Sequence, residues 1–474
     1  MVMSMKVRAL AVLGLLCPVS TLFAAPPETQ YLPAASHLDR LEQPTATGDS
    51  RRTQHINNSD LAAQPELAKA MLDRAVSEGQ WPIVRAILPV YAASPQPDEI
   101  LIHFARAGLA RSEGHYDRAI KHYRAILSAH PEFAAVRLEL ARAMYENRQT
   151  DAAEYQFRRV LSSNPPENVQ QIIAQYLDRI HRGSPLTGSF SLSYLNDSNV
   201  NNASSGDTVR IGDRLFIRNK DSLPQRGEGV QFSGALQKDV QLYNQHGLRF
   251  LGTVYGKSYW NNHRFDDVTG RVYAGYQWRD FRQQFAVLPF YEQRWYGTES
   301  YSSGPGVRAE YSYLLSPRWQ ISQALEYQKL GYDNGDYAFL RGHNRLSSTT
   351  LSHALNSRIS LFGGVDLLDQ QTLTQSENNR RIGLRTGAQV DLPWKLSFSA
   401  MGAFSRRQYE ADSDIFSLRR RDNEQYYSLA VWHRDLDLFG LMPKLNFTYK
   451  RVNSNIDFYD YHQRNISISL DKNF

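Results

Sequence analysis

The second half of the chain alternates between apolar and polar residues from about residue 187 to the end. In RRIGLRTGAQVDL, Ile382, Leu384 and Val390 fall on one face of an extended strand, whereas Arg381 and Arg385 fall on the other. The segments RVYAGYQWR, VRAEYSY and KLNFTYK repeat this pattern. Successive side chains of a strand point to opposite faces, so the pattern predicts strands with one apolar face that must be shielded from water.

The length of these segments and of their connections indicates where that face lies. Strands of soluble sandwiches run about five or six residues, whereas these run about ten or more, which suits a tilted bilayer crossing. Short connections such as YNQHG and LPW alternate with longer ones, among them residues 297–306 and 410–423. Aromatic residues near strand ends, such as Tyr259 and Trp260, fit the aromatic girdles of a barrel. The fourteen strand candidates are centred near Leu192, Ala235, Thr253, Ala274, Leu288, Glu310, Leu325, Thr349, Gly363, Arg385, Met401, Ala430, Phe447 and Ile468.

An even number of antiparallel strands, with short and long connections alternating, predicts an outer-membrane β-barrel over residues 187–474. The last strand, NISISLDKNF, places Ile466, Ile468, Leu470 and Phe474 on the apolar face. Such an ending resembles the signal by which the barrel assembly machinery recognises its substrates. These four residues are therefore the candidate assembly signal.

The first half of the chain is helical and contains a repeat. From about residue 61 to residue 183 apolar residues recur at spacings of three and four, and two segments match at a distance of 34 residues. Small residues at helix crossings, an aromatic plug and a final proline are typical of tetratricopeptide (TPR) repeats. The matched residues are Ala107, Gly114, Ala119, Tyr123 and Pro131 in the first repeat and Ala141, Arg148, Ala153, Phe157 and Pro165 in the second.

A TPR stack presents a concave groove that usually takes a polypeptide. The groove candidates, taken from the first helix of each repeat, are Phe104, Arg111, Leu138, Arg142 and Tyr145. The alternative interpretation is a spacer domain without a ligand. The fold class predicted overall is an all-α TPR-like domain over residues 61–183, followed by a fourteen-stranded antiparallel transmembrane barrel.

The N-terminus predicts export. Lys6 and Arg8 precede an apolar run from Leu10 to Phe23, and Ala24-Ala25 follows it, which is the pattern of a secretory signal peptide over residues 1–25. Residues 26–60 are predicted to be a flexible segment. The single cysteine, Cys17, lies inside the apolar run, so the mature chain would hold no thiol and no disulfide or cysteine-based metal site.

The sequence offers no set of residues typical of an enzyme. Ser352 and His353 are adjacent, so they point to opposite faces of a strand, and Asp366 and Asp369 do the same. The histidines show no metal-site spacing, and no cofactor is expected.

The formal net charge is +6, but the basic residues are dispersed along the strands, which argues against nucleic acid as a partner. The run of residues 419–421, three arginines, is predicted to lie in a long loop, where it would meet lipopolysaccharide phosphates, the exported protein, or neither.

This architecture resembles the Slam family, the surface lipoprotein assembly modulators of the type XI secretion system. The polar segment YLNDSNVNNA, Tyr194 to Ala203, is similar to a segment of that family. The resemblance implies a Gram-negative outer-membrane translocon, with the helical domain and both termini in the periplasm. Its helical domain would capture a cognate lipoprotein or a secreted, haem-binding protein, called the client below, and export it.

The route of the client stays open at this stage. It could pass through the lumen or between the first and last strands, near Leu192 and Ile468. Two other functions also stay open, a passive porin or solute channel and a host-contact surface protein that acts through its loops.

Overall fold

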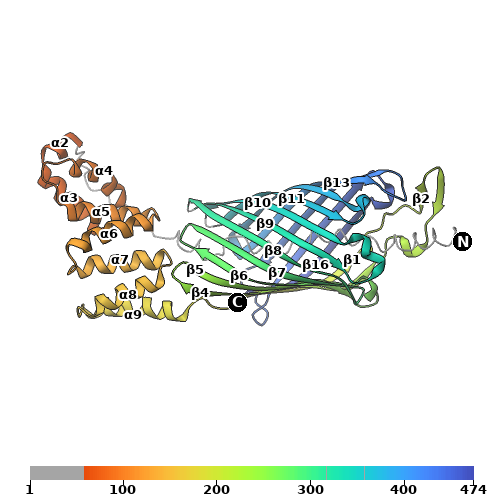
Figure 1. Cartoon of the computed structure of the whole chain (residues 1–474), viewed down its shortest axis with the longest axis horizontal. Helices are drawn as coiled ribbons and strands as arrows, with labels where there is room; N and C mark the ends of the chain where they lie inside the picture. The colour runs from red at the N-terminus through yellow and green to blue at the C-terminus, as the bar shows by residue number, and fades with distance from the viewer. Residues whose placement is uncertain (1–57, 317, 357, 474) are drawn as a thin grey trace.

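The computed structural model describes residues 58–316, 318–356 and 358–473. Figure 1 shows a stack of helices beside one end of a long barrel. We call the barrel end next to the helices the helical end and the opposite end the far end. The structure confirms the predicted fold class, a helical repeat domain followed by a closed fourteen-stranded antiparallel barrel. The predicted signal peptide, residues 26–57 and Phe474 of the candidate assembly signal lie outside the described residues.

The described helices pair in sequence order, and α5 with α6 and α7 with α8 form the two predicted repeats. The small residues Ala107, Ala119, Ala141 and Ala153 are fully buried where helices cross, so the backbones approach closely. Tyr123 and Phe157 fill the remaining space in the same core. The helices are α2 (Asn58–Ala63), α3 (Pro65–Ser77), α4 (Trp81–Ala92), α5 (Glu99–Ser112), α6 (Tyr116–Ala129), α7 (Ala134–Glu146), α8 (Thr150–Leu161) and α9 (Glu167–Arg182). None of the described helices is long and apolar enough to cross a bilayer.

The barrel strands follow one another around the ring in chain order, and β1 closes on β16. They are β1 (Thr187–Asp197), β4 (Gly227–Tyr243), β5 (His246–Tyr259), β6 (Asp267–Arg279), β7 (Gln283–Tyr296), β8 (Glu299–Ser316), β9 (Trp319–Tyr332), β10 (Gly342–Asn356), β11 (Ile359–Thr372), β12 (Asn379–Asp391), β13 (Leu396–Asp412), β14 (Arg419–His433), β15 (Met442–Ser454) and β16 (Tyr461–Asn473). A separate hairpin, β2 (Thr208–Ile211) and β3 (Arg214–Ile217), lies beyond the far end (Figure 1).

The alternation along the strands sorts side chains as a lipid-facing barrel requires. On β12, Ile382 and Leu384 are more than half exposed on the outer wall, whereas Arg381, the residue before Ile382, is buried inside. On β6, Val272 faces outward and Arg271 inward in the same way. Apolar residues outside and charged residues inside are the reverse of a soluble protein and the rule for outer-membrane barrels.

One predicted loop, residues 297–306, is wrong. β8 begins at Glu299 and pairs with β7, which leaves a tight turn of Gly297 and Thr298. The glycines of this segment suggested a loop. Glycine within a strand, however, also marks a place where a neighbouring strand or side chain packs closely. A Cβ at Gly304 would lie 1.7 Å from the carbonyl oxygen of Lys329, and one at Gly306 would lie 2.2 Å from the ring of Phe290.

Two further predictions are wrong for the same part of the barrel, its far end. Arg419, Arg420 and Arg421 belong to the first residues of β14 rather than to a loop. Arg420 pairs with Asp422 at 2.8 Å and lies 3.6 Å from the ring centre of Tyr459. Tyr259, predicted for an aromatic girdle, is fully buried, because its hydroxyl donates to a buried carboxylate described below.

The helical domain rests on the barrel through the inter-helix turn of its first repeat. Arg282, in the β6–β7 turn, donates from Nη2 to the carbonyl oxygen of Glu113 at 2.6 Å. The rings of Tyr116 and Phe281 meet edge to face at 4.8 Å. Gly114 has a φ of +71°, which favours glycine, and a Cβ there would lie 2.7 Å from the Phe281 ring, so a larger residue would displace that ring.

The equivalent turn of the second repeat rests on the β4–β5 turn. Gln245 donates from Nε2 to the carbonyl oxygen of Asn147 at 3.0 Å, and the backbone N–H of Asn244 donates to the Asp151 carboxylate at 2.9 Å. The position that matches Gly114 is Arg148, which adopts the same left-handed conformation with a φ of 61°. Two separate turns therefore hold the helical domain at the mouth of the barrel.

We expect the double substitution Phe281→Ala and Arg282→Ala to loosen this docking. It removes one aromatic contact and one hydrogen-bonding side chain, together about 2 kcal/mol, which corresponds to a roughly thirtyfold shift toward the undocked state. Limited proteolysis of the purified protein in detergent, at the linker of residues 183–186, measures the shift. The control is Phe439→Ala, since Phe439 lies in the β14–β15 turn with 99% of its surface exposed. Equal cleavage rates in both variants would contradict the docking role.

Candidate functional site

The five groove candidates lie together on the first helices of the two repeats. Phe104 and Arg111 are on α5, and Leu138, Arg142 and Tyr145 are on α7. All five are half-buried at the edge of the helical core. Each therefore packs against the domain with one side and leaves another side open to a ligand.

Glu139 links the two basic candidates and was not predicted. Its carboxylate pairs with Arg111 from the neighbouring repeat and with Arg142 on its own helix, the latter at 2.7 Å. Burial lowers the pKa of Arg111, but the carboxylate of Glu139 together with nearby acidic groups outweighs this effect, so the pKa is raised. The neighbouring Tyr123 is deeply buried, which raises its pKa to about 12. The basic candidates are thus part of an ion-paired clip that joins the repeats, and only the spacing of Glu139 and Arg142, three residues apart, could have signalled it.

Aromatic contacts hold the other candidates in place. Phe104 meets Tyr123 edge to face at 5.7 Å, and Tyr145 meets Tyr176 of α9 at 5.0 Å in the same geometry. Leu138 packs against the same helical core. Half-exposed aromatic and aliphatic side chains around one ionic clip can bind an extended or helical polypeptide, and they offer no group arranged for covalent chemistry.

The lumen is crossed by an ionic network on the wall from β4 to β9. Arg271 of β6 pairs with Glu292 of β7 and, at 3.1 Å, with Glu326 of β9. Arg308 of β8 pairs with the same Glu326 at 3.1 Å and with Glu310 at 2.7 Å. The side chains of all five are at most one-tenth exposed.

The network continues to β4. Arg249 of β5 lies 3.6 Å from Glu310 and 3.1 Å from Asp239. Ion pairs such as Arg271 with Glu326 join strands that are not neighbours, so these side chains span part of the lumen instead of lining it. A wide aqueous pore would hydrate them, whereas these are buried.

The seam between β1 and β16 is shorter than the neighbouring contacts. Among the described residues its register runs only from Ser189 with Asn473 to Ser193 with Ser469, which is five pairs. On its other side β1 pairs with β4 over eleven residues, from Thr187 to Asp197. β16 likewise pairs with β15 over eleven residues.

Residues 194–197 of β1 and 465–468 of β16 therefore keep their strand conformation and face each other without a ladder. Asn465 lies in this stretch, and its side-chain oxygen is buried without a hydrogen-bond partner. An unpaired strand edge is a template for a further strand. The ladder that closes the seam lies at the helical end, where β16 ends (Figure 1).

At the far end of the seam, side-chain hydrogen bonds connect the two strands in place of the backbone ladder. Asp197 is buried, and its carboxylate accepts from the Tyr259 hydroxyl at 2.8 Å and from Nε2 of Gln463 on β16 at 2.6 Å. Ser198 and Asn199 make longer contacts of 3.4 Å to the backbone of β16. These residues belong to the polar segment Tyr194–Ala203, which is thus the clasp that holds the far end of the seam.

Glu326 accepts from both Arg271 and Arg308, so we expect Glu326→Ala to leave two buried guanidinium groups with one fewer carboxylate. Breaking a buried ion pair from one side costs about 3 kcal/mol or more. Heating in SDS, followed by electrophoresis, reports the unfolding temperature of the barrel. The matched control is Glu299→Ala, at the exposed start of β8. An unfolding temperature equal to that of the control would show that the network is not structural.

The comparisons with known proteins agree with this geometry. Residues 187–474 match the profile of a family described as "Surface lipoprotein assembly modifier". Residues 54–157 match a second profile, "Surface lipoprotein assembly modifier, N-terminal TPR repeats". The first profile covers the barrel, and the second covers the first repeat and the second as far as residue 157.

Several curated relatives match along most of their length. A "Surface lipoprotein assembly modifier" of Pasteurella multocida (strain Pm70) is 29% identical over 473 residues, which is 95% of this chain and 92% of the relative. The "Surface lipoprotein assembly modifier 1" of Haemophilus influenzae (strain ATCC 51907 / DSM 11121 / KW20 / Rd) is 29% identical over 88% of this chain and 87% of its own. A "Hemophilin secretion modulator" of Acinetobacter baumannii is 26% identical over 88% of both chains. Consistent with the resemblance seen in the sequence, the chain belongs to the surface lipoprotein assembly modifier family.

Proposed function

We propose that this protein exports a client protein across the outer membrane of a Gram-negative cell. The helical domain captures the client at the inner side of the membrane and delivers it to the barrel. The names of the relatives support a client that is a lipoprotein or a secreted protein of the hemophilin kind. No enzymatic step and no cofactor is part of this proposal.

The observation that carries the proposal is the two-point docking of the repeats. Because both inter-helix turns rest on barrel turns, the groove cannot swing away from the mouth of the barrel. A passive channel for small solutes would gain nothing from a polypeptide-binding groove held at its entrance. The buried ionic network in the lumen also disfavours a passive pore.

The proposal places the helical end in the periplasm. With an even number of strands, β1 begins and β16 ends on the same side, so the helical domain and the C-terminus share that side (Figure 1). Apart from the β14–β15 connection, the connections at the helical end span two to four residues, as expected of periplasmic turns. Apart from the tight β7–β8 turn, those at the far end span six residues or more, and the longest carries the β2–β3 hairpin. The far end is then the cell surface.

The seam is the route that the structure favours for the client. The lumen is narrowed from β4 to β9, whereas the seam is closed by a short ladder and a clasp of side chains. No nucleotide triphosphate is available in the periplasm, so opening must draw on binding of the client and on its folding outside. Separating β1 from β16 breaks a ladder of five pairs. Separating β1 from β4, or β15 from β16, would break eleven.

Deletion of residues 61–182 tests the capture role. We expect the shortened protein to assemble as a heat-modifiable barrel, while surface display of the client falls at least tenfold. The client to use is a small exported protein or lipoprotein encoded in the neighbouring reading frame, measured by protease accessibility on intact cells. Display at the full level with the barrel alone would refute capture by the helical domain.

A disulfide across the seam tests the route. Ser191 and Asp471 are register partners, and the Ser191 hydroxyl donates to the carboxylate at 2.6 Å, so Ser191→Cys with Asp471→Cys places two thiols side by side. The matched control is Ser191→Cys with Ser233→Cys, a register pair between β1 and β4. We expect oxidation to stop export in the seam variant alone and a reductant to restore it.

If export is unchanged while the disulfide holds the seam closed, the client passes through the lumen instead. Conductance in liposomes provides a second measurement for the passive-channel alternative. A large, steady conductance that the client does not alter would favour a porin.

A further inference from the structure

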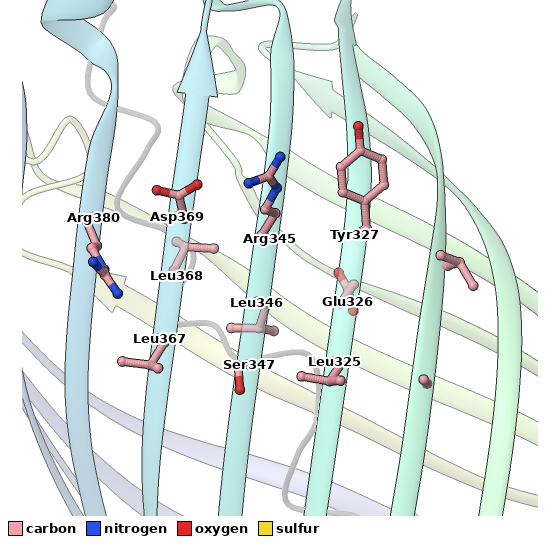
Figure 2. A pocket seen from close by; sticks show the side chains of 12 residues that line it. Leu325, Glu326, Tyr327, Arg345, Leu346, Ser347, Leu367, Leu368, Asp369 and Arg380 are labelled. Carbon is pink, nitrogen blue, oxygen red and sulfur yellow. The ribbon is translucent and has the colours of Figure 1, made fainter.

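A row of charged side chains crosses the outer wall of the barrel near its far end. Arg345 of β10 is in register with Tyr327 of β9 and with Asp369 of β11, and Asp369 is in register with Arg380 of β12. Figure 2 shows these four side chains at one level across neighbouring strands. We call these four residues the outer-wall row.

The row faces away from the lumen. Tyr327 is 46% exposed, while its neighbour Glu326 is buried in the lumen network. Arg345 and Arg380 are exposed, whereas Arg381, the next residue of β12, is buried. Register partners share a face, so the four side chains point outward together.

The cations of the row are not neutralised by the protein. Among the described residues neither Arg345 nor Arg380 has an ion-pair partner, although Asp369 lies between them. Lys329, two residues beyond Tyr327 on the same face, is exposed and adds a third cation. Three positive charges and one negative charge give this small area a net charge of +2. Asp369 keeps the two arginines from repelling each other while leaving both guanidinium groups available.

Next to the outer-wall row, toward the middle of the barrel, the outer wall becomes apolar. Leu325, Val307 and Leu367 line the same hollow from the apolar side, and Ile382 beside them is half exposed. The hollow has a volume of about 610 Å³ and contains Arg345, Asp369 and Arg380 at its other edge (Figure 2). It is therefore an amphipathic site, with an apolar floor inside the bilayer and a cationic rim beyond it.

An unpaired arginine on the lipid-facing wall costs about 2–4 kcal/mol at the middle of the bilayer and about 0–1 kcal/mol at its surface. The row therefore belongs at the level of the head groups. Guanidinium groups bind phosphate oxygens in bidentate fashion, and cations near a membrane surface are attracted to anionic head groups.

We propose that the outer-wall row binds the phosphorylated head group of lipopolysaccharide, the anionic lipid of the outer leaflet. Arg345 and Arg380 bind the phosphates, Lys329 adds charge, and Leu325 and Leu367 contact an acyl chain. The inference rests on the proposed orientation, in which the far end is the cell surface. The site is distinct from the groove, the lumen network and the seam, because it lies on the outside of β8 to β12.

Lipid binding to the purified full-length protein tests the site. The variant is Arg345→Gln with Arg380→Gln, which removes both charges and keeps polar side chains at these positions. The matched control is Arg318→Gln, an exposed arginine in the β8–β9 turn at the helical end. Each protein is placed in nanodiscs, its fold is checked by heat modifiability, and binding of fluorescent lipopolysaccharide is measured.

We expect the double variant to bind lipopolysaccharide about tenfold more weakly, as the loss of two charge-assisted contacts implies, and the control to match the unmodified protein. Dephosphorylated lipopolysaccharide should bind all three proteins equally. Equal affinity of the double variant and the unmodified protein would overturn the proposal. Competition by millimolar inorganic phosphate, or equal binding of phosphatidylglycerol, would overturn the assignment to lipopolysaccharide.

This measurement requires no client. If the unmodified protein exports no client but binds lipopolysaccharide more tightly than the double variant does, the proposed function is wrong and the lipid site stands. If export is intact and the difference is absent, the lipid site is wrong and the proposed function stands.

Discussion

Every backbone N–H and C=O group of a segment within a bilayer must find its partner in the protein, because lipid tails offer none. Closure of the sheet meets this requirement for fourteen strands at once, and it fixes most of what surrounds it. The outer faces must be apolar, the charged residues must turn inward, and the inward charges must then neutralise one another, as Arg271, Glu326 and Arg308 do. The seam between β1 and β16 is where this constraint is met least completely, with five register pairs. A weak closure in lipid is costly, so its presence calls for a functional explanation.

The helical domain depends on the same rigidity. Its two inter-helix turns rest on the β4–β5 and β6–β7 turns, which are short and held by strands on both sides. Docking at two points fixes the orientation of a stack in a way that one point cannot. Gly114 shows how closely the sequence of the repeat is adapted to the barrel, because the ring of Phe281 occupies the space where a side chain would begin. A glycine that is ordinary in the repeat pattern is here also part of the joint between the two domains.

The features that could be predicted from the sequence are those that repeat locally. A period of two over long segments located all fourteen strands, and a match at 34 residues located two repeats, because both patterns depend on neighbours in the chain. The errors arose where local composition imitates a loop: Gly304 and Gly306 permit close strand packing, and Arg420 is neutralised by Asp422 within a strand. The lumen pairs that join non-neighbouring strands, and the short register of the seam, follow from closure of the ring. No local pattern carries that information.

The distribution of these features around the ring supports opening at one place. The buried ion pairs tie β4 to β9 into a unit whose strands cannot separate without leaving charges unpaired in a poorly hydrated space. The seam lies next to one edge of that unit. In its clasp Asp197 accepts hydrogen bonds and Ser198 and Asn199 donate them, at the end of the barrel where water can replace their partners. Breaking such contacts costs less than breaking an ion pair inside the lumen, since polar groups that separate next to the membrane surface regain hydration. A force applied to the barrel by a bound client would therefore separate β1 from β16 before it separated any pair within the ionic wall.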